Sequence, residues 1–141
     1  RAIRDVYKRQ YLHMPEGAVG KEGPSAGVAF AASLISLLTK RALPTTLAMT
    51  GEVSLRGMVL PVGGLKEKLL AAHRAGIQTV ILPAQNRPSV EADVPRTVLD
   101  ALDVHYVTNV WAALEIAFGP GPWSEPAQVW SQKESPDAAM E

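Results

Sequence analysis

The sequence predicts an α/β (α+β) fold, in which helices pack on a mixed β-sheet that includes a β-hairpin. Stretches with apolar residues at helical spacing alternate with short β-branched runs, and glycines and prolines stand between them. The chain has 141 residues, 47% of them hydrophobic, which is enough for one domain with its own core. One layered α/β domain is therefore expected.

In the first half of the chain, alternation of apolar and polar residues predicts a strand at 11–14. A loop rich in glycine and proline follows at 15–24. Residues 25–40 are expected to form a helix, because apolar side chains recur there at helical spacing. Residues 46–50 are typical of a buried strand, and residues 52–62 of a hairpin.

In the second half, residues 64–75 predict a helix that starts after two glycines and is capped by Gly76. A short strand is expected at 79–82, followed by a polar loop that contains Asn86-Arg87-Pro88. The remaining expected elements are a helix at 95–101, a strand at 104–107 and a helix at 110–118.

The chain divides into three expected parts. Residues 1–10 are basic and stand apart, residues 11–118 form the domain, and residues 119–141 form a loosely ordered tail despite Trp123 and Trp130.

Composition excludes several functional classes. Basic and acidic residues number 14 each, so the zero net charge gives no basis for binding nucleic acid or an anionic membrane surface. The chain has no cysteine, which excludes disulfides, a thiol nucleophile and cysteine-ligated metal. The longest apolar run, residues 28–38, is too short to span a bilayer. The three histidines are scattered without metal-ligand spacing. An intracellular, soluble protein without a metal is expected.

Ser25 is a candidate nucleophile. It lies in Glu22-Gly23-Pro24-Ser25-Ala26-Gly27, directly before an apolar helical stretch. Its neighbours are small, and the backbone N–H groups of Ser25 and Ala26 at a helix start could stabilise an oxyanion. The alternative is that Ser25 is an ordinary helix N-cap.

Lys68 is a candidate general base. On a helical wheel it shares a side with Leu65 and three alanines, whereas Lys66 points about 200° away. A lysine on an apolar face is expected to be desolvated, and desolvation lowers a lysine pKa toward the range of a general base. The alternative is that the side chain extends past the alanines to water.

Together these motifs resemble the proteolytic domain of the Lon family of ATP-dependent proteases. The matching runs, in chain order, are Met14-Pro15-Glu16-Gly17-Ala18, Gly23-Pro24-Ser25-Ala26-Gly27, Ala48-Met49-Thr50-Gly51-Glu52, Leu55-Arg56-Gly57, residues 60–68 and residues 71–76. The resemblance implies that Ser25 is the nucleophile and Lys68 the base, with Thr50 supporting the lysine amine. One residue departs from the pattern, since Glu22 stands where the family usually has aspartate.

The resemblance also implies a biological setting. A Lon-type serine endopeptidase degrades unfolded or damaged polypeptides as a hexamer, and a separate ATPase module supplies ATP hydrolysis. No cofactor is expected in this chain, and ATP and Mg²⁺ belong to that module. The fold is then a partial Lon-type domain, because the family has further strands before residue 11. The stretch 17–21 and the Gly/Pro-rich ending after Phe118 favour the peroxisomal branch over the bacterial one.

Three other interpretations compete with an active Lon-type protease. The chain could be an inactive fragment or a non-enzymatic assembly module of Lon-like fold. Gly23-x-Ser25-x-Gly27 also fits the nucleophile elbow of an α/β-hydrolase, with Asp100 or Asp103 as acid and His105 as base. A phosphate-binding loop at 17–21 is excluded, because Glu22 replaces the hydroxyl residue that would bind magnesium.

Overall fold

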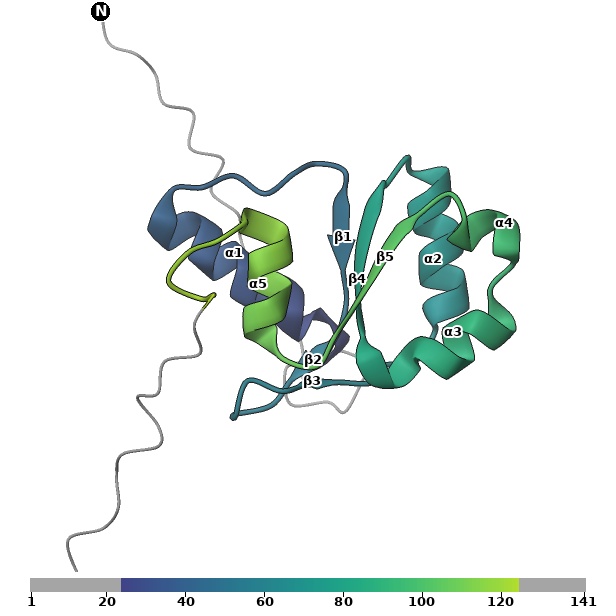
Figure 1. Ribbon diagram of the computed structural model, residues 1–141, viewed down its shortest axis with the longest axis horizontal. Coiled ribbons are helices and arrows are strands. Elements are labelled where there is room, and N and C mark those ends of the chain that lie inside the picture. The colour runs from purple at the N-terminus through teal and green to yellow at the C-terminus, as the bar shows by residue number, and fades with distance from the viewer. Residues whose placement is uncertain (1–23, 125–141) are drawn as a thin grey trace, which may run out of the picture.

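The computed structural model describes residues 24–124, which form layers of helices around a small central sheet (Figure 1). Three parallel strands make this sheet in the order β1-β4-β5. They are β1 (Leu47–Met49), β4 (Thr79–Pro83) and β5 (Asp103–Val107). Two short antiparallel strands, β2 (Glu52–Val53) and β3 (Val59–Leu60), form the expected hairpin. The mixed α/β class is confirmed.

Helices cover both faces of the parallel sheet. On one face lie α1 (Gly27–Thr39), which follows the 3-10 turn η1 (Pro24–Ala26), and α5 (Val110–Phe118) (Figure 1). On the other face lie α2 (Leu65–Arg74), α3 (Arg87–Asp93) and α4 (Arg96–Leu99) (Figure 1). A second 3-10 turn, η2 (Ala84–Asn86), connects β4 to α3.

The central strand β4 divides the core in two. Successive strand side chains point to opposite faces, so Ile81 enters one cluster while Val80 and Leu82 enter the other. The first cluster joins α1, α5 and Trp123, and the second joins α2, α3 and α4. The helix that follows Ser25 and the helix that carries Lys68 therefore pack on opposite faces of the sheet.

The prediction of a polar loop between β4 and residue 95 is wrong, because residues 87–93 form α3. Pro88 lies in the first turn of this helix, where a missing N–H breaks no intrahelical bond. Val90 and Val94 are buried against α2, four residues apart on one side of the chain. Proline here starts a helix, whereas the sequence interpretation took it as a loop residue.

The predicted loose tail is also wrong for its first six residues. Trp123 is 4% exposed, and its indole N–H donates to the carbonyl of Gly119 at 2.8 Å. Its ring packs on Phe118 with centroids 5.4 Å apart, and the guanidinium of Arg41 lies 5.4 Å from the Trp123 ring centroid. Trp123 therefore ties the segment 119–124 to the first core cluster.

Several expectations lie outside the described residues. They are the basic segment 1–10, the strand 11–14, most of the loop 15–24 including Glu22, and the tail 125–141.

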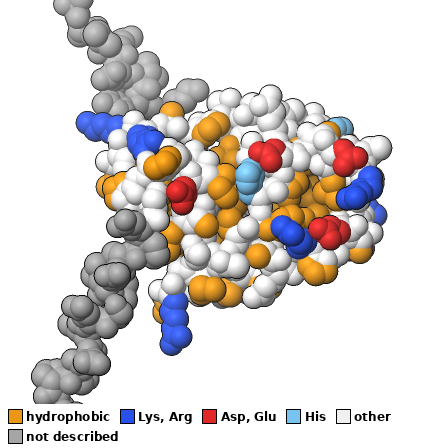
Figure 2. All heavy atoms as spheres, in the orientation of Figure 1, with side chains coloured by type: hydrophobic (Ala, Val, Ile, Leu, Met, Phe, Trp, Pro, Cys, Tyr) orange, Lys and Arg blue, Asp and Glu red, His pale blue; other side chains and the backbone are white. Residues whose placement is uncertain are grey.

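The surface mixes charges of both signs with exposed apolar side chains (Figure 2). On α1, Leu34, Leu37 and Leu38 are between 60% and 76% exposed. At the tip of the β2–β3 hairpin, Leu55 is fully exposed. Within residues 24–124, no helix is long and apolar enough to cross a membrane.

Candidate active site

Ser25 lies in the middle of the turn η1, which leads directly into α1. Its side chain is half-buried. The N-cap residue of α1 is Ala26, and no side chain caps this helix. Ser25 is therefore held at the start of a helix without serving as the cap of α1.

Thr50 and Gly51 fix the backbone of Ser25. The Thr50 hydroxyl donates to the Ser25 carbonyl at 3.0 Å, and the Gly51 N–H donates to the same oxygen at 2.8 Å. The Gly51 carbonyl in turn accepts from the Val28 N–H at 3.1 Å. The structure thus brings Thr50 to Ser25, and its hydroxyl holds the Ser25 backbone.

Two glycines allow this close approach. A Cβ on Gly27 would lie 2.8 Å from the Val53 backbone nitrogen, so only glycine lets α1 come this near to β2. Gly51 has φ +155°, and a Cβ there would lie 2.7 Å from a methyl group of Val59. The backbone that follows Ser25 therefore lies in close contact with the hairpin.

Lys68 lies on α2, whose first residue follows Gly64 in the left-handed conformation. The Lys68 N–H donates to the Gly64 carbonyl at 3.1 Å. The Lys68 side chain is exposed, so the expected desolvation is not found. The buried face of α2 is centred on Leu65 and Leu69, and at 100° per residue Lys68 points about 80° to one side of it.

Two of the three alanines that the wheel placed beside Lys68 explain the error. Ala71 and Ala75 are exposed, so the small-residue side of α2 is not its packed side. Within the described residues, no hydrogen bond joins the Lys68 amine to Thr50. The Ser25–Lys68 pair therefore stays a prediction.

Both segments nevertheless approach the same end of the sheet. Thr50 follows β1 directly, and its N–H donates to the Ile81 carbonyl of β4 at 3.1 Å. Asn86 lies three residues after β4, and its side-chain amide bonds both backbone groups of Val62, just before α2. Carboxyl ends of parallel strands are where α/β proteins commonly place their sites. The sequence interpretation missed Asn86, since nothing in the local pattern identifies its partner.

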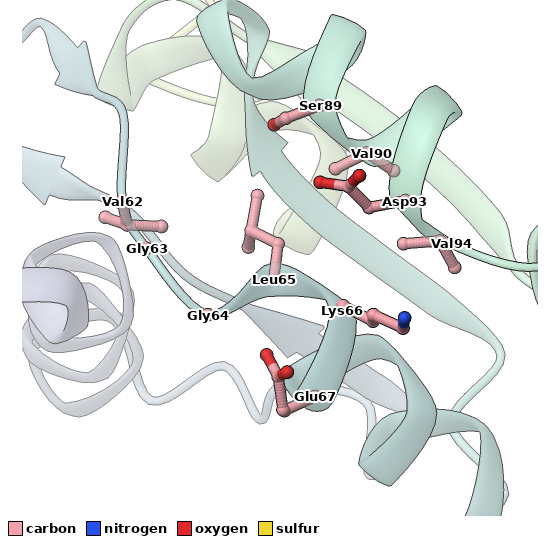
Figure 3. A pocket seen from close by; sticks show the side chains of 10 residues that line it. All are labelled: Val62, Gly63, Gly64, Leu65, Lys66, Glu67, Ser89, Val90, Asp93 and Val94. Carbon is pink, nitrogen blue, oxygen red and sulfur yellow. The ribbon is translucent and has the colours of Figure 1, made fainter.

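A hollow of about 360 Å³ lies beside the start of α2 (Figure 3). Lys66 and Glu67 line it from α2, and Ser89 and Asp93 line it from α3 (Figure 3). Neither Ser25 nor Lys68 lines this hollow.

The geometry does not favour the α/β-hydrolase alternative. His105 bonds Asp103 through Nε2 at 2.8 Å, and both lie on β5. In register, His105 pairs with Ile81 and Ile81 with Met49, so β5 lies two strands, about 10 Å, from the end of β1 near Ser25. Asp100 lies just after α4, on the face of the sheet opposite α1.

Ionisable groups elsewhere give no second site. Among residues 24–124, no group of three His, Asp or Glu side chains is arranged to hold a metal ion. Tyr106 on β5 has a raised pKa, because burial and the Glu91 carboxylate disfavour the phenolate more than the Arg87 guanidinium favours it.

Comparison with known proteins matches most of the chain to one family. The family model of the Lon protease (S16) C-terminal proteolytic domain matches residues 3–119, which includes most of the basic segment that the sequence interpretation set apart. The Lon protease of Frankia alni is 56% identical over 110 residues, covering 78% of this chain and 12% of that protein. The Lon protease of Escherichia coli K12 is 48% identical over 120 residues, covering 84% of this chain and 15% of that protein.

The chain thus spans less than a sixth of the length of these relatives. Both relatives are bacterial, so they give no support to the peroxisomal assignment.

Proposed function

Because the chain belongs to the Lon protease (S16) family, we propose that it provides the catalytic residues of a serine endopeptidase that cleaves unfolded or damaged polypeptides. Ser25 is the nucleophile, Lys68 the general base and Thr50 the residue that supports them. The observation that carries the proposal is the pair of hydrogen bonds that fixes the Ser25 carbonyl to Thr50 and Gly51. A nucleophile must be held still to react efficiently, and these bonds hold it at a helix start.

The mechanism is amide hydrolysis through an acyl-enzyme. Neutral Lys68 takes the proton of the Ser25 hydroxyl as its oxygen attacks the scissile carbonyl carbon. The resulting ammonium then gives that proton to the departing amine, and the ester to Ser25 remains. A water molecule, deprotonated by Lys68, attacks this ester and releases the acid and the Ser25 hydroxyl. Serine–lysine pairs are a known variant of the serine–histidine arrangement.

The Thr50 hydroxyl has a defined part in this scheme. Its single proton is donated to the Ser25 carbonyl, so its lone pairs are available only as acceptors. They suit an N–H of the Lys68 amine, which would then be directed toward Ser25. The geometry of Thr50 supports this role without requiring a second proton from it.

The wider setting is part of the proposal. The remaining length of the relatives leaves room for the ATPase module that the family resemblance implies, with ATP and Mg²⁺ held there. A hexameric ring of such chains would enclose the serines.

Substitution of the two residues in the intact protein tests the proposal. We expect Ser25→Ala and Lys68→Ala to abolish hydrolysis of casein and of a fluorogenic peptide. Lys66→Ala is the matched control, because Lys66 is also exposed on the first turns of α2 and is expected to leave activity unchanged. Retained peptide cleavage by Ser25→Ala would show that Ser25 is not the nucleophile.

A second candidate function rests on the exposure of Lys68. The Lys68 side chain is exposed and, within the described residues, no hydrogen bond joins its amine to Thr50, which favours a Lon-like module that assembles without cleaving peptides. Wild-type protein that binds casein yet never cleaves it would favour this alternative.

A further inference from the structure

Asn86 forms an unusual clamp on the segment before α2. Its Oδ1 accepts from the Val62 N–H at 2.9 Å, and its Nδ2 donates to the Val62 carbonyl at 3.0 Å. One side chain thus satisfies both backbone groups of a single residue, as a neighbouring strand would. Only an amide offers a donor and an acceptor in this fixed arrangement.

A short path leads from this clamp to Lys68. Val62 is followed by Gly63 and Gly64, and the Gly64 carbonyl accepts the backbone N–H of Lys68 at 3.1 Å. Neither glycine has a side chain that could anchor it, and no side chain caps α2. Among residues 24–124, the Asn86 clamp is therefore the side-chain hydrogen bonding nearest to the start of the lysine helix.

Packing around the first turn of α2 is incomplete. The hollow of about 360 Å³ separates the first turn of α2 from α3 (Figure 3). Leu65 points from α2 toward α3, while Lys66 and Glu67 lie along the rim (Figure 3). Leu65 is 7% exposed and packs in the second cluster, so this one apolar contact and the polar bonds before the helix together set the direction of the first turn.

The same strand supports the nucleophile. Ile81 of β4 accepts the N–H of Thr50, whose hydroxyl holds Ser25, and Asn86 lies in the turn that follows β4. Strand β4 and the turn that follows it therefore bond to both segments, to that of Ser25 through Thr50 and to the start of α2 through Asn86. We propose that Asn86 is a positioning residue that sets the start of α2, and hence Lys68, relative to Ser25. This inference rests on the proposed function.

The test uses variants of the intact protein and an activated ester substrate. Asn86→Ala removes both bonds to Val62. We expect kcat to fall about 10- to 100-fold with KM within about twofold, because a small misplacement of a catalytic group costs rate without costing binding. Ser89→Ala is the matched control, since it removes only the exposed bond from the Ser89 hydroxyl to the Asn86 carbonyl, and we expect no change.

A double-mutant cycle separates positioning from general damage. If Asn86 acts through Lys68, then Asn86→Ala should change the residual activity of a Lys68→Ala variant less than twofold. A further fall of about tenfold in that background would show that Asn86 acts elsewhere and would overturn the inference. An unchanged kcat in Asn86→Ala alone, or a loss confined to KM, would also overturn it.

Two further results, an Asn86→Ala variant that does not fold and a Ser25→Ala variant that stays active, each have a defined consequence. If Asn86→Ala does not fold, Asn86→Asp decides the question, because it keeps the acceptor for the Val62 N–H and places a carboxylate oxygen against the Val62 carbonyl. A lower kcat with unchanged KM then supports the inference, and an unchanged kcat overturns it. If Ser25→Ala remains active, the proposed function fails, whatever the Asn86 variants show.

Discussion

The contact between α1 and β2 should be unusually sensitive to one methyl group. In Gly27→Ala, the new Cβ would lie 2.8 Å from the Val53 backbone nitrogen and 3.2 Å from the Gly51 carbonyl oxygen. Backbone atoms cannot rotate away, so helix and strand would have to separate by about 0.6 Å to reach ordinary contact. That separation lengthens the bond from the Gly51 N–H to the Ser25 carbonyl and the bond from the Val28 N–H to Gly51.

The magnitude follows from three opposing effects. Overpacking costs about 1–3 kcal/mol, and weakening two backbone bonds costs up to about 1 kcal/mol each. Alanine in place of glycine in a helix returns about 1 kcal/mol. We therefore expect Gly27→Ala to lower the free energy of unfolding by about 2–3 kcal/mol, measured by urea denaturation followed by circular dichroism.

Gly63→Ala provides the control for this prediction. Beyond its two chain neighbours, no atom of residues 24–124 lies within 4 Å of a Cβ built there, so the free energy of unfolding should stay within about 0.5 kcal/mol of wild type or rise slightly. If Gly27→Ala were as stable as Gly63→Ala, the close approach of α1 to β2 would not be what holds Ser25 in place.

Three further predictions concern Thr50, Tyr106 and Trp123. Thr50→Val removes the donor to the Ser25 carbonyl and should lower kcat about tenfold, whereas Thr50→Ser should retain most activity; equal rates in peptide assays would contradict the role of the hydroxyl. Burial raises the pKa of Tyr106 above its ordinary value of 10.0, so the unfolded chain loses this proton first. Stability should therefore fall as pH rises from about 10 through the raised folded value, and Tyr106→Phe should flatten that part of the profile in alkaline denaturation. Trp123→Ala should cost about 3–5 kcal/mol of unfolding free energy, because the ring is 4% exposed; a cost below about 1 kcal/mol would mean that residues 119–124 add little to the core.

The sequence alone predicted the features that depend on local patterns. Apolar spacing located α1, α2 and α5 and the strands β1, β4 and β5 to within a few residues, because burial of one face dictates that spacing. The small residues around Ser25 and their resemblance to a known motif predict Ser25 as the nucleophile, and this assignment stays a prediction.

Features that depend on distant partners were not predictable. Pro88 reads as a loop residue until Val90 and Val94 are seen packed against α2. Trp123 reads as part of a tail until Arg41, more than eighty residues earlier, is seen over its ring. Asn86 is one polar residue among several until its partner Val62 is known.

Lys68 shows where the wheel argument itself fails. A helical wheel tells which residues share a side, but tertiary packing decides which side is buried. Leu65 and Leu69 define the buried side of α2. The side of Ala71 and Ala75 is left exposed, because leucine buries more apolar area than alanine against α3 and α4. The result is a lysine at the edge of the packed face instead of at its centre.

The segments that carry Ser25 and Lys68, the two residues of the proposed dyad, pack in different core clusters. The helix after Ser25 packs with Ile81 in the first cluster, and the lysine helix packs with Leu82 in the second. Because these are neighbouring residues of one strand, β4 is the rigid body that relates the two clusters. A cavity-forming substitution in one cluster should therefore loosen only the segment that packs there, either that of Ser25 or that of Lys68. A substitution at the carboxyl end of β4 should instead change the position of one segment relative to the other. In the proposed dyad, the distance between Ser25 and Lys68 would depend above all on the hydrogen bonds that the side chains of Thr50 and Asn86 make at this end of the sheet.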